Sequence, residues 1–293
     1  MPRDLADVLH YFLPELESEP EPTRSAPADL ARERDRPESP PALPILGIPI
    51  GDGEILGAAL AWNLAVETAR LSGAATLLTP TESGDSPLWP EPGTGPLGTG
   101  LRFSQASDLA DLHREALALA RAEAARARDG GILFVRIPTR WLPGAEGARR
   151  APESAEETRQ PFRWILLLAP ARTRELKPVA RLASDLLRSD PGLELAVTIH
   201  GARTIDEARR AFDHLSTLTE RAIAAGPSRP GDRSAPRRDV LSSCGMLVDD
   251  LHVYRAIAAQ KPIGLAHPQA PAARALMDVA RILYEDSRRL PLG

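Results

Sequence analysis

The sequence predicts an α/β protein in which helices cover both faces of a doubly wound, mostly parallel sheet. Short apolar runs recur along the chain without polar alternation, which is typical of strands buried on both faces. Segments with helical periodicity separate these runs, and the β–α–β order favours parallel strands joined by crossover helices. The chain has 293 residues, of which 43% are hydrophobic, and this suits a domain of that class.

Each predicted strand is a short apolar run, and each predicted helix has an amphipathic period. Strands are expected at 44–50, 75–80, 131–138, 164–170 and 193–200, with a weaker one at 240–248. Helices are expected at 57–72, 105–128, 174–189, 204–224 and 271–288. Asp249 and Asp250 are expected to cap a further helix, because Asp accepts hydrogen bonds from the N–H groups at helix starts.

The α/β domain is placed at 44–288, and the N-terminal extension divides into two parts. Residues 1–17 predict an amphipathic helix that ends before Pro14. Residues 18–43 are rich in Pro and charge and predict a disordered linker. The helix carries one apolar stripe, formed by Leu5, Val8, Leu9, Phe12 and Leu13. Pro- and Gly-rich segments predict mobile loops near 81–100, 143–161 and 226–238.

Two interpretations of the N-terminal helix are open. The helix can fold back on its own domain as an arm. Alternatively, it can place its apolar stripe in the groove of a protein partner, as tethered amphipathic helices do.

Composition excludes several classes of protein. The formal net charge is −4 and nearly all of the positive charge is Arg, so we expect no nucleic-acid partner. Cys244 is the single cysteine, which excludes an internal disulfide and predicts a buried small side chain. We find no metal-ligand cluster, expect no cofactor, and find no signal peptide or membrane span, so we expect a cytoplasmic protein.

The run from Gly47 to Ala69, GIPIGDGEILGAALAWNLAVETA, has the shape of a phosphate-binding loop that leads into a helix. An apolar run comes first, a glycine-rich turn follows, and small residues continue with helical spacing. Together with the downstream runs 164–215 and 245–276, it resembles the MinD/ParA group of P-loop ATPases, nearest to the branch that regulates flagellar number. The closing run 245–276 agrees in residue types as well as in spacing.

The resemblance implies a P-loop NTPase-like, three-layered fold and assigns a role to each position of the loop. The family's first glycine falls on Gly51 and its family-specific lysine on Asp52. Its phosphate lysine falls on Gly57, and its magnesium-binding hydroxyl falls on Ala58. The loop of this chain is formed by Gly51, Asp52, Gly53, Glu54, Gly57 and Ala58.

Three further positions depart from the family. Thr79 stands where the resemblance implies an acidic residue that orients magnesium, and Arg136 stands where it implies the Asp of the second nucleotide motif. His200 falls on or near an adenine-reading Asn, although an isolated loop histidine is the alternative. Arg136 can hold an anion, but we favour a pair with Asp52 or Glu54 across the site.

These departures predict a fold that is kept and an ATPase activity that is lost. Phosphoryl transfer depends on positioning and electrostatic stabilisation, and the loop offers acidic side chains instead of a lysine and a hydroxyl. We therefore expect a non-catalytic pseudo-ATPase that acts as a regulator or scaffold, with no metal and no catalytic residue. The alternatives are an unconventional ATPase that takes its lysine from Lys177 or Lys261, and a small-anion sensor that uses Gly51, Gly53 and Arg136.

The expected partners are proteins. They would bind the N-terminal helix and the domain surface, and a homodimer is compatible with the resemblance. The last twelve residues, ILYEDSRRLPLG, contain no basic amphipathic helix, so we expect no stable membrane anchor there. By analogy with the family, the setting would be the positioning of a flagellum, a pilus or chromosomal cargo.

Overall fold

The computed structural model describes residues 42–81, 93–127, 130–143, 161–225 and 240–289. The chain divides into two units, Met1–Ser39 and Pro40–Gly293, and every described residue belongs to the second. The predicted N-terminal helix with its apolar stripe, and nearly all of the linker, lie outside the described residues. The same holds for nearly all of the loops predicted at 143–161 and 226–238.

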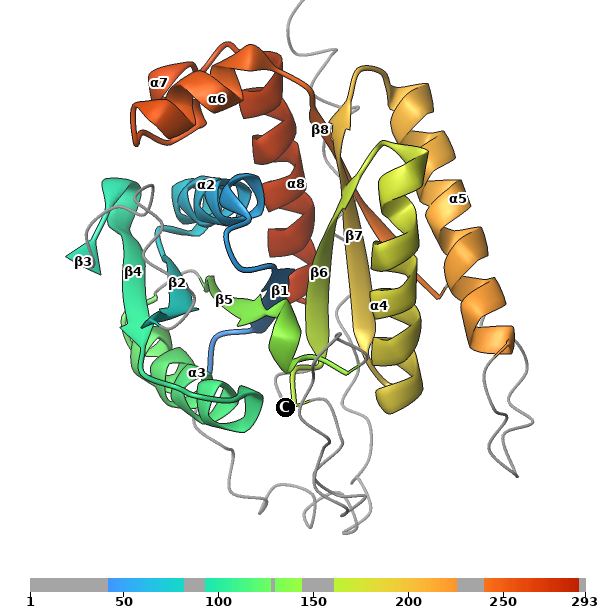
Figure 1. The fold of residues 1–293 in the computed structure, drawn as a ribbon. Helices are drawn as coiled ribbons and strands as arrows, with labels where there is room; N and C mark the ends of the chain where they lie inside the picture. Colours follow the sequence, from blue (N-terminus) through green and yellow to red (C-terminus); the bar gives the residue numbers. More distant parts are fainter. Residues whose placement is uncertain (1–41, 82–92, 128–129, 144–160, 226–239, 290–293) are drawn as a thin grey trace, which may run out of the picture. The chain divides into compact units, whose positions relative to one another are not determined.

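A single sheet organises the domain, with strand order β3-β4-β2-β5-β1-β6-β7-β8. Its strands pair in parallel, except that β3 pairs antiparallel to β4 at the edge of the sheet (Figure 1). The prediction of a doubly wound, mostly parallel sheet is confirmed. The strands are β1 (Ile45–Ile50), β2 (Ala75–Pro80), β3 (Gly93–Thr94), β4 (Thr99–Ser104), β5 (Ile132–Pro138), β6 (Trp164–Pro170), β7 (Glu194–Ala202) and β8 (Ser242–Val248).

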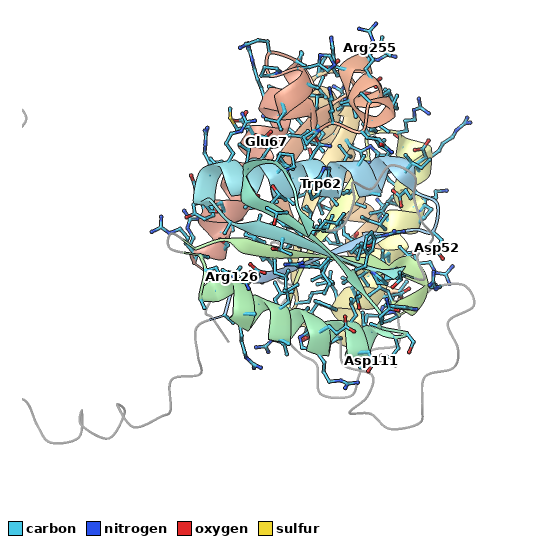
Figure 2. The ribbon with its side chains drawn as sticks, turned by 90° about the vertical axis from the view of Figure 1, so that its left-hand side faces the viewer. Asp52, Trp62, Glu67, Asp111, Arg126 and Arg255 are labelled. Carbon is cyan, nitrogen blue, oxygen red and sulfur yellow. The ribbon has the colours of Figure 1, made fainter. Side chains whose placement is uncertain are left out.

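Helices cover both faces of the sheet and make three layers. On one face, α2 packs against α8, with α6 and α7 beside them; α3, α4 and α5 cover the other face. Figure 2 shows α2 and α3 on opposite sides of the strands. The α-helices are α2 (Ile55–Ser72), α3 (Leu109–Ala124), α4 (Leu176–Ser189), α5 (Ile205–Ala224), α6 (Leu251–Ala258), α7 (Ile263–Ala266) and α8 (Pro271–Ser287). The described residues also form the short 3₁₀ turns η4 (Pro96–Gly98), η5 (Thr139–Trp141) and η6 (Thr173–Glu175).

Burial on both faces explains the apolar runs. Neighbouring residues of β5 alternate between the two cores, because successive strand side chains point to opposite faces. Phe134 lies in the core under α2 and α8, whereas Leu133 and Val135 lie in the core under α3, α4 and α5. Cys244 on β8 is fully buried, as predicted, and burial raises the pKa of its thiol to about 12.

The loop predicted near 81–100 is wrong for residues 93–100. These residues form β3, η4 and the start of β4, which pairs with β2 from Ala75↔Thr99 onward. One of the glycines that suggested a loop, Gly100, serves this pairing instead. A Cβ at Gly100 would lie 2.7 Å from the Thr76 hydroxyl oxygen, so the two strands approach closely only because position 100 has no side chain.

Local capping fixes where several helices begin. Asp108 accepts a hydrogen bond from the Asp111 N–H at the start of α3, and Thr204 accepts one from Glu207 at the start of α5. Asp250 caps α6 by accepting from the His252 N–H, which confirms the predicted role of that residue. No helix within the described ranges is long and apolar enough to cross a bilayer.

Candidate functional site

The candidate site lies at the carboxyl ends of the central strands. β1 stands between β5 and β6, and the strands that follow it in sequence lie on both sides of it. Open α/β sheets bind ligands at such a reversal of strand order, because the loops after the two flanking strands part there. The turn after β1, residues 51–54, opens at this point and leads directly into α2.

The turn is closed by its own side chain. The Glu54 carboxylate accepts a hydrogen bond from the Gly51 N–H at 3.0 Å, and the Glu54 N–H donates to the Gly51 carbonyl at 3.2 Å. Gly53 adopts φ = 74°, a left-handed conformation that glycine enters at little cost. The Glu54 carboxylate therefore already accepts the hydrogen bond of one backbone N–H group in this loop.

The first turn of α2 holds the two positions where the resemblance implies a lysine and a hydroxyl. Gly57 and Ala58 are both buried there. A Cβ built on Gly57 would lie 2.9 Å from Glu54 Oε1, so the carboxylate fills the space beside this glycine. The Ala58 N–H donates to the Glu54 carbonyl and so begins the helix.

Arg136 lies beneath the turn. On β5, this residue stands opposite Ile48 of β1 in the strand register. Its side chain is only 2% exposed, and its Nη2 donates a hydrogen bond to the Gly51 carbonyl at 3.3 Å. Burial lowers the pKa of Arg136, while the charges of Asp52 and Glu54 raise it. The guanidinium thus compensates the two acidic side chains from below and holds the start of the turn.

The ion pair to Asp52 comes from a residue that the sequence analysis did not single out. Arg140, on η5, pairs with Asp52, and its guanidinium also lies 5.6 Å from the centre of the Trp141 ring. The prediction favoured Arg136 as the partner of Asp52 or Glu54. It did not include Arg140, because 88 residues of sequence separate Arg140 from Asp52. Figure 2 shows Asp52 at the end of the sheet where α2 begins.

Thr79 does not reach the site. It pairs with Phe103 of β4 within the sheet and is 1% exposed. Its hydroxyl has no hydrogen-bond partner among the described residues. Of the three further positions that depart from the family, Thr79 and Arg136 are buried, and His200 lines a cleft.

A cleft of about 870 Å³ opens beside the turn. His200, at the end of β7, lines it; burial lowers the pKa of this histidine, and the nearby charge of Glu175 raises it. The cleft is lined by Pro49, Gly51, Glu54, Thr139, Arg140, Leu167, Leu168, Pro170, Glu175, Lys177, Pro178, Val179, Arg181, Leu182 and His200. Three or more His, Cys, Asp or Glu side chains grouped as metal ligands are not found in the part of the chain that the structure describes.

Comparison with solved structures identifies the fold. MinD of Aquifex aeolicus superposes with a TM-score of 0.55 at 14% identity, over 85% of this chain and 99% of that chain. The same protein in the MinC:MinD cell division complex gives a TM-score of 0.54 at 14% identity, over 85% and 98%. The fold is that of MinD. The MinD of Pyrococcus horikoshii, complexed with Mg-ADP, is also similar, with a TM-score of 0.48 at 10% identity over 82% of this chain and 96% of that chain.

The MinD-type fold is shared without close similarity of sequence. No protein-family model and no curated protein sequence matches the chain. The resemblance to the MinD/ParA ATPases in fold, and the P-loop NTPase-like architecture that it implied, are confirmed. At 14% identity the likeness extends to the fold and leaves the chemistry of the site to be argued from this chain's own residues.

Proposed function

We propose that this protein is a MinD/ParA-like pseudo-ATPase of the cytoplasm that acts as a regulator or scaffold in positioning a cellular structure, such as a flagellum, a pilus or chromosomal cargo. One observation carries the proposal: the turn after β1 supplies its own anion. The Glu54 carboxylate takes the Gly51 N–H and lies against Gly57, where a nucleotide phosphate would otherwise need to approach.

The residues of the turn do not fit ATP and magnesium. A phosphate loop works through backbone N–H groups, a lysine for the phosphates and a hydroxyl for the metal. Here Gly57 and Ala58 supply neither side chain, and Asp52 and Glu54 place two negative charges beside the loop. Two like charges at 4 Å repel by about 1 kcal/mol in water and by more where screening is poor, so each carboxylate opposes a triphosphate.

The basic residues beneath and beside the turn support the same conclusion. Arg136 donates to the Gly51 carbonyl, and Arg140 pairs with Asp52. Both cations therefore act within the protein, where they balance the acidic turn. A turn that holds its own carboxylate and two neighbouring cations does not need a nucleotide to order it, so the domain can present a fixed surface.

The partner-binding part of the proposal concerns the N-terminal helix. We infer that its apolar stripe, Leu5, Val8, Leu9, Phe12 and Leu13, docks in the groove of a protein partner. The α/β domain would then offer a second contact surface, and a homodimer is compatible with this arrangement. Capture experiments with the full chain and with a chain that lacks residues 1–17 test this part, because a partner retained equally by both would remove the helix from the proposal.

Calorimetry with ATP and ADP, with and without magnesium, tests the main proposal. We expect no heat and no thermal shift at millimolar nucleotide. Micromolar, magnesium-dependent binding together with phosphate release would overturn it. The test uses the full chain, and its stability in buffer alone provides the baseline.

A second candidate function rests on Lys177. This residue lines the same cleft as Gly51, so a lysine from α4 faces the cleft beside the turn although it is distant in sequence. An unconventional ATPase would lose hydrolysis in Lys177→Ala and keep it in Lys261→Ala. The small-anion sensor built on Gly51, Gly53 and Arg136 is weaker, because the Glu54 carboxylate already holds the Gly51 N–H.

A further inference from the structure

The cleft beside β1 has an apolar floor built from strand ends. Its lining includes the strand residues Pro49, Leu167, Leu168 and Pro170, here called the floor, together with Val179 and Leu182 of α4. Proline donates no backbone hydrogen bond, and β1 pairs with β6 only at Gly47↔Ile165. The carboxyl-terminal half of β1 is therefore not bridged to β6, and the cleft lies where this pairing stops.

The size of the cleft suits a small molecule. Ligand sites in proteins typically have volumes of about 300–1,000 Å³, and this cleft has about 870 Å³. It also lies at the carboxyl ends of the strands, where sheets of this class bind their ligands. A concave pocket of this kind encloses the body of a compact ligand, whereas an extended peptide needs a long groove or an open strand edge.

Two cations on α4, Lys177 and Arg181, border the cleft. Lys177 and Arg181 are exposed, stand one helical turn apart, and form no ion pair with another described residue. Like charges at this spacing on a helix repel each other weakly, so the two side chains do not stabilise α4 by interacting with each other. An anion between them would remove this repulsion.

The acidic residues of the cleft are already engaged. The Glu54 carboxylate accepts from the Gly51 N–H, and Glu175 pairs with Arg172 at 3.7 Å. Arg140, which also lines the cleft, is paired with Asp52. The cationic side of the cleft is therefore the α4 wall, next to the apolar floor.

We propose that this cleft binds a small amphipathic anion. The apolar body of the anion rests on the floor, and its carboxylate, sulfonate or phosphate group is held by Lys177 and Arg181. The proposal does not depend on the state of the loop after β1. It concerns the α4 side of the cleft, so it holds whether or not that loop admits a nucleotide.

Fluorescence titration of the full chain with anilinonaphthalene sulfonate tests the proposal, because this probe combines an aromatic body with a sulfonate. We expect saturable binding at one site. The double variant Lys177→Glu/Arg181→Glu should weaken binding by about 30-fold or more, from the loss of two charge contacts and their replacement by repulsion. The double variant Arg209→Glu/Arg210→Glu changes the net charge equally on exposed positions of α5 outside the cleft and should bind like the original chain.

A second variant tests the apolar lining of the cleft independently of charge. Val179→Trp should narrow the cleft on its α4 side and reduce probe binding while both cations remain. Circular dichroism and thermal melting show that each variant is folded. Dodecanoate should displace the probe, and inorganic phosphate at the same concentration should not, because it lacks the apolar body.

Several outcomes would overturn the proposal. These are the absence of saturable probe binding, equal binding by the charge-reversed α4 variant, and equal binding by Val179→Trp. Displacement by polyglutamate but not by dodecanoate would assign the cleft to an acidic peptide instead. Displacement of the probe by micromolar ATP would count against the pseudo-ATPase proposal but would leave the anion-binding proposal standing. The two proposals can therefore fail separately.

Discussion

The Glu54 carboxylate occupies the space that a side chain at position 57 would need: a Cβ on Gly57 would lie 2.9 Å from Glu54 Oε1 and 3.1 Å from Cδ. The same carboxylate accepts the Gly51 N–H. The acidic residue and the missing side chain are therefore coupled features of one turn. A side chain at position 57 can enter only if Glu54 leaves and gives up its hydrogen bond to Gly51.

This coupling predicts that one substitution cannot restore a phosphate loop. Gly57→Lys alone should leave ADP binding undetectable, because the displaced Glu54 carboxylate stays beside the loop and its negative charge opposes phosphate. In Glu54→Gly/Gly57→Lys, we expect ADP affinity to rise by about 10- to 100-fold, as a charge-assisted contact of about 1.5–3 kcal/mol is gained. Calorimetry against both single variants measures the difference, and equal binding by Gly57→Lys alone would show that Glu54 does not block the site.

The sequence predicted the strands and helices well because strands that are buried on both faces appear in the sequence as continuous apolar runs. β1, β2, β5 and β6 are apolar runs buried on both faces, and burial of that kind leaves a continuous hydrophobic signal. β4 was missed because Thr99–Ser104 contains glycine and arginine and lies in a Pro/Gly-rich region. Its strand conformation depends on pairing with β2, and local sequence does not report such a partner.

The site was predictable only in part, for a similar reason. The turn at residues 51–54 could be found, because a glycine-rich segment between a strand and a helix is a local signal. Lys177 and Arg181 could not be assigned to a cleft, since exposed cations on an amphipathic helix look alike on every face. Arg140 was missed as well, because its pair with Asp52 exists only after β1 and β5 align side by side.

Arg136 should stabilise the turn after β1. In Arg136→Met, the Gly51 carbonyl loses its donor and the charges of Asp52 and Glu54 lose a compensating cation. We expect the free energy of unfolding to fall by about 1–3 kcal/mol, measured by urea denaturation.

Arg102→Met on β4 is the matched control, because Arg102 is exposed and should change stability by less than about 0.5 kcal/mol. An Arg136→Met protein as stable as the control would show that the buried guanidinium costs as much in desolvation as it returns.

Glu67 should give the protein a pH dependence that is centred on α2. Its side chain is 2% exposed, burial raises its pKa above the ordinary 4.5, and the charge of Arg70 lowers it. Since the folded state holds this proton more tightly than the unfolded chain, the stabilising contribution is full below pH 4.5 and is lost as pH rises through the folded-state pKa. Urea denaturation over this pH range measures the effect.

Glu67→Gln should remove this contribution to the pH dependence. The difference in unfolding free energy between Glu67→Gln and the original chain should grow in favour of the variant as pH rises. Glu115→Gln, at an exposed position of α3, should run parallel to the original chain. Parallel curves for all three proteins would mean that Glu67 ionises as freely in the folded state as in the unfolded chain.

The Glu67 carboxylate also limits the size of the side chain at position 264 of α7. A Cβ on Gly264 would lie 1.9 Å from Glu67 Oε1, while Arg70 Nη2 donates to the Gly264 carbonyl at 3.3 Å. Figure 2 shows Glu67 on α2, on the side of that helix where α6 and α7 lie. The glycine therefore allows α7 to approach α2 over a buried carboxylate.

A double-mutant cycle at this contact separates steric conflict from simple loss of packing. Gly264→Ala should lower the free energy of unfolding by about 1–3 kcal/mol through overpacking. In Glu67→Ala/Gly264→Ala, the loss of unfolding free energy should be smaller than the sum of the two single losses by about 0.5–3 kcal/mol. The reason is that the truncated side chain at position 67 leaves room for the new methyl group. Leu265→Ala, at an exposed neighbour on α7, controls for the short helix itself. Additive effects in the cycle would show that α7 moves away as a unit, and that Glu67 does not set its distance from α2.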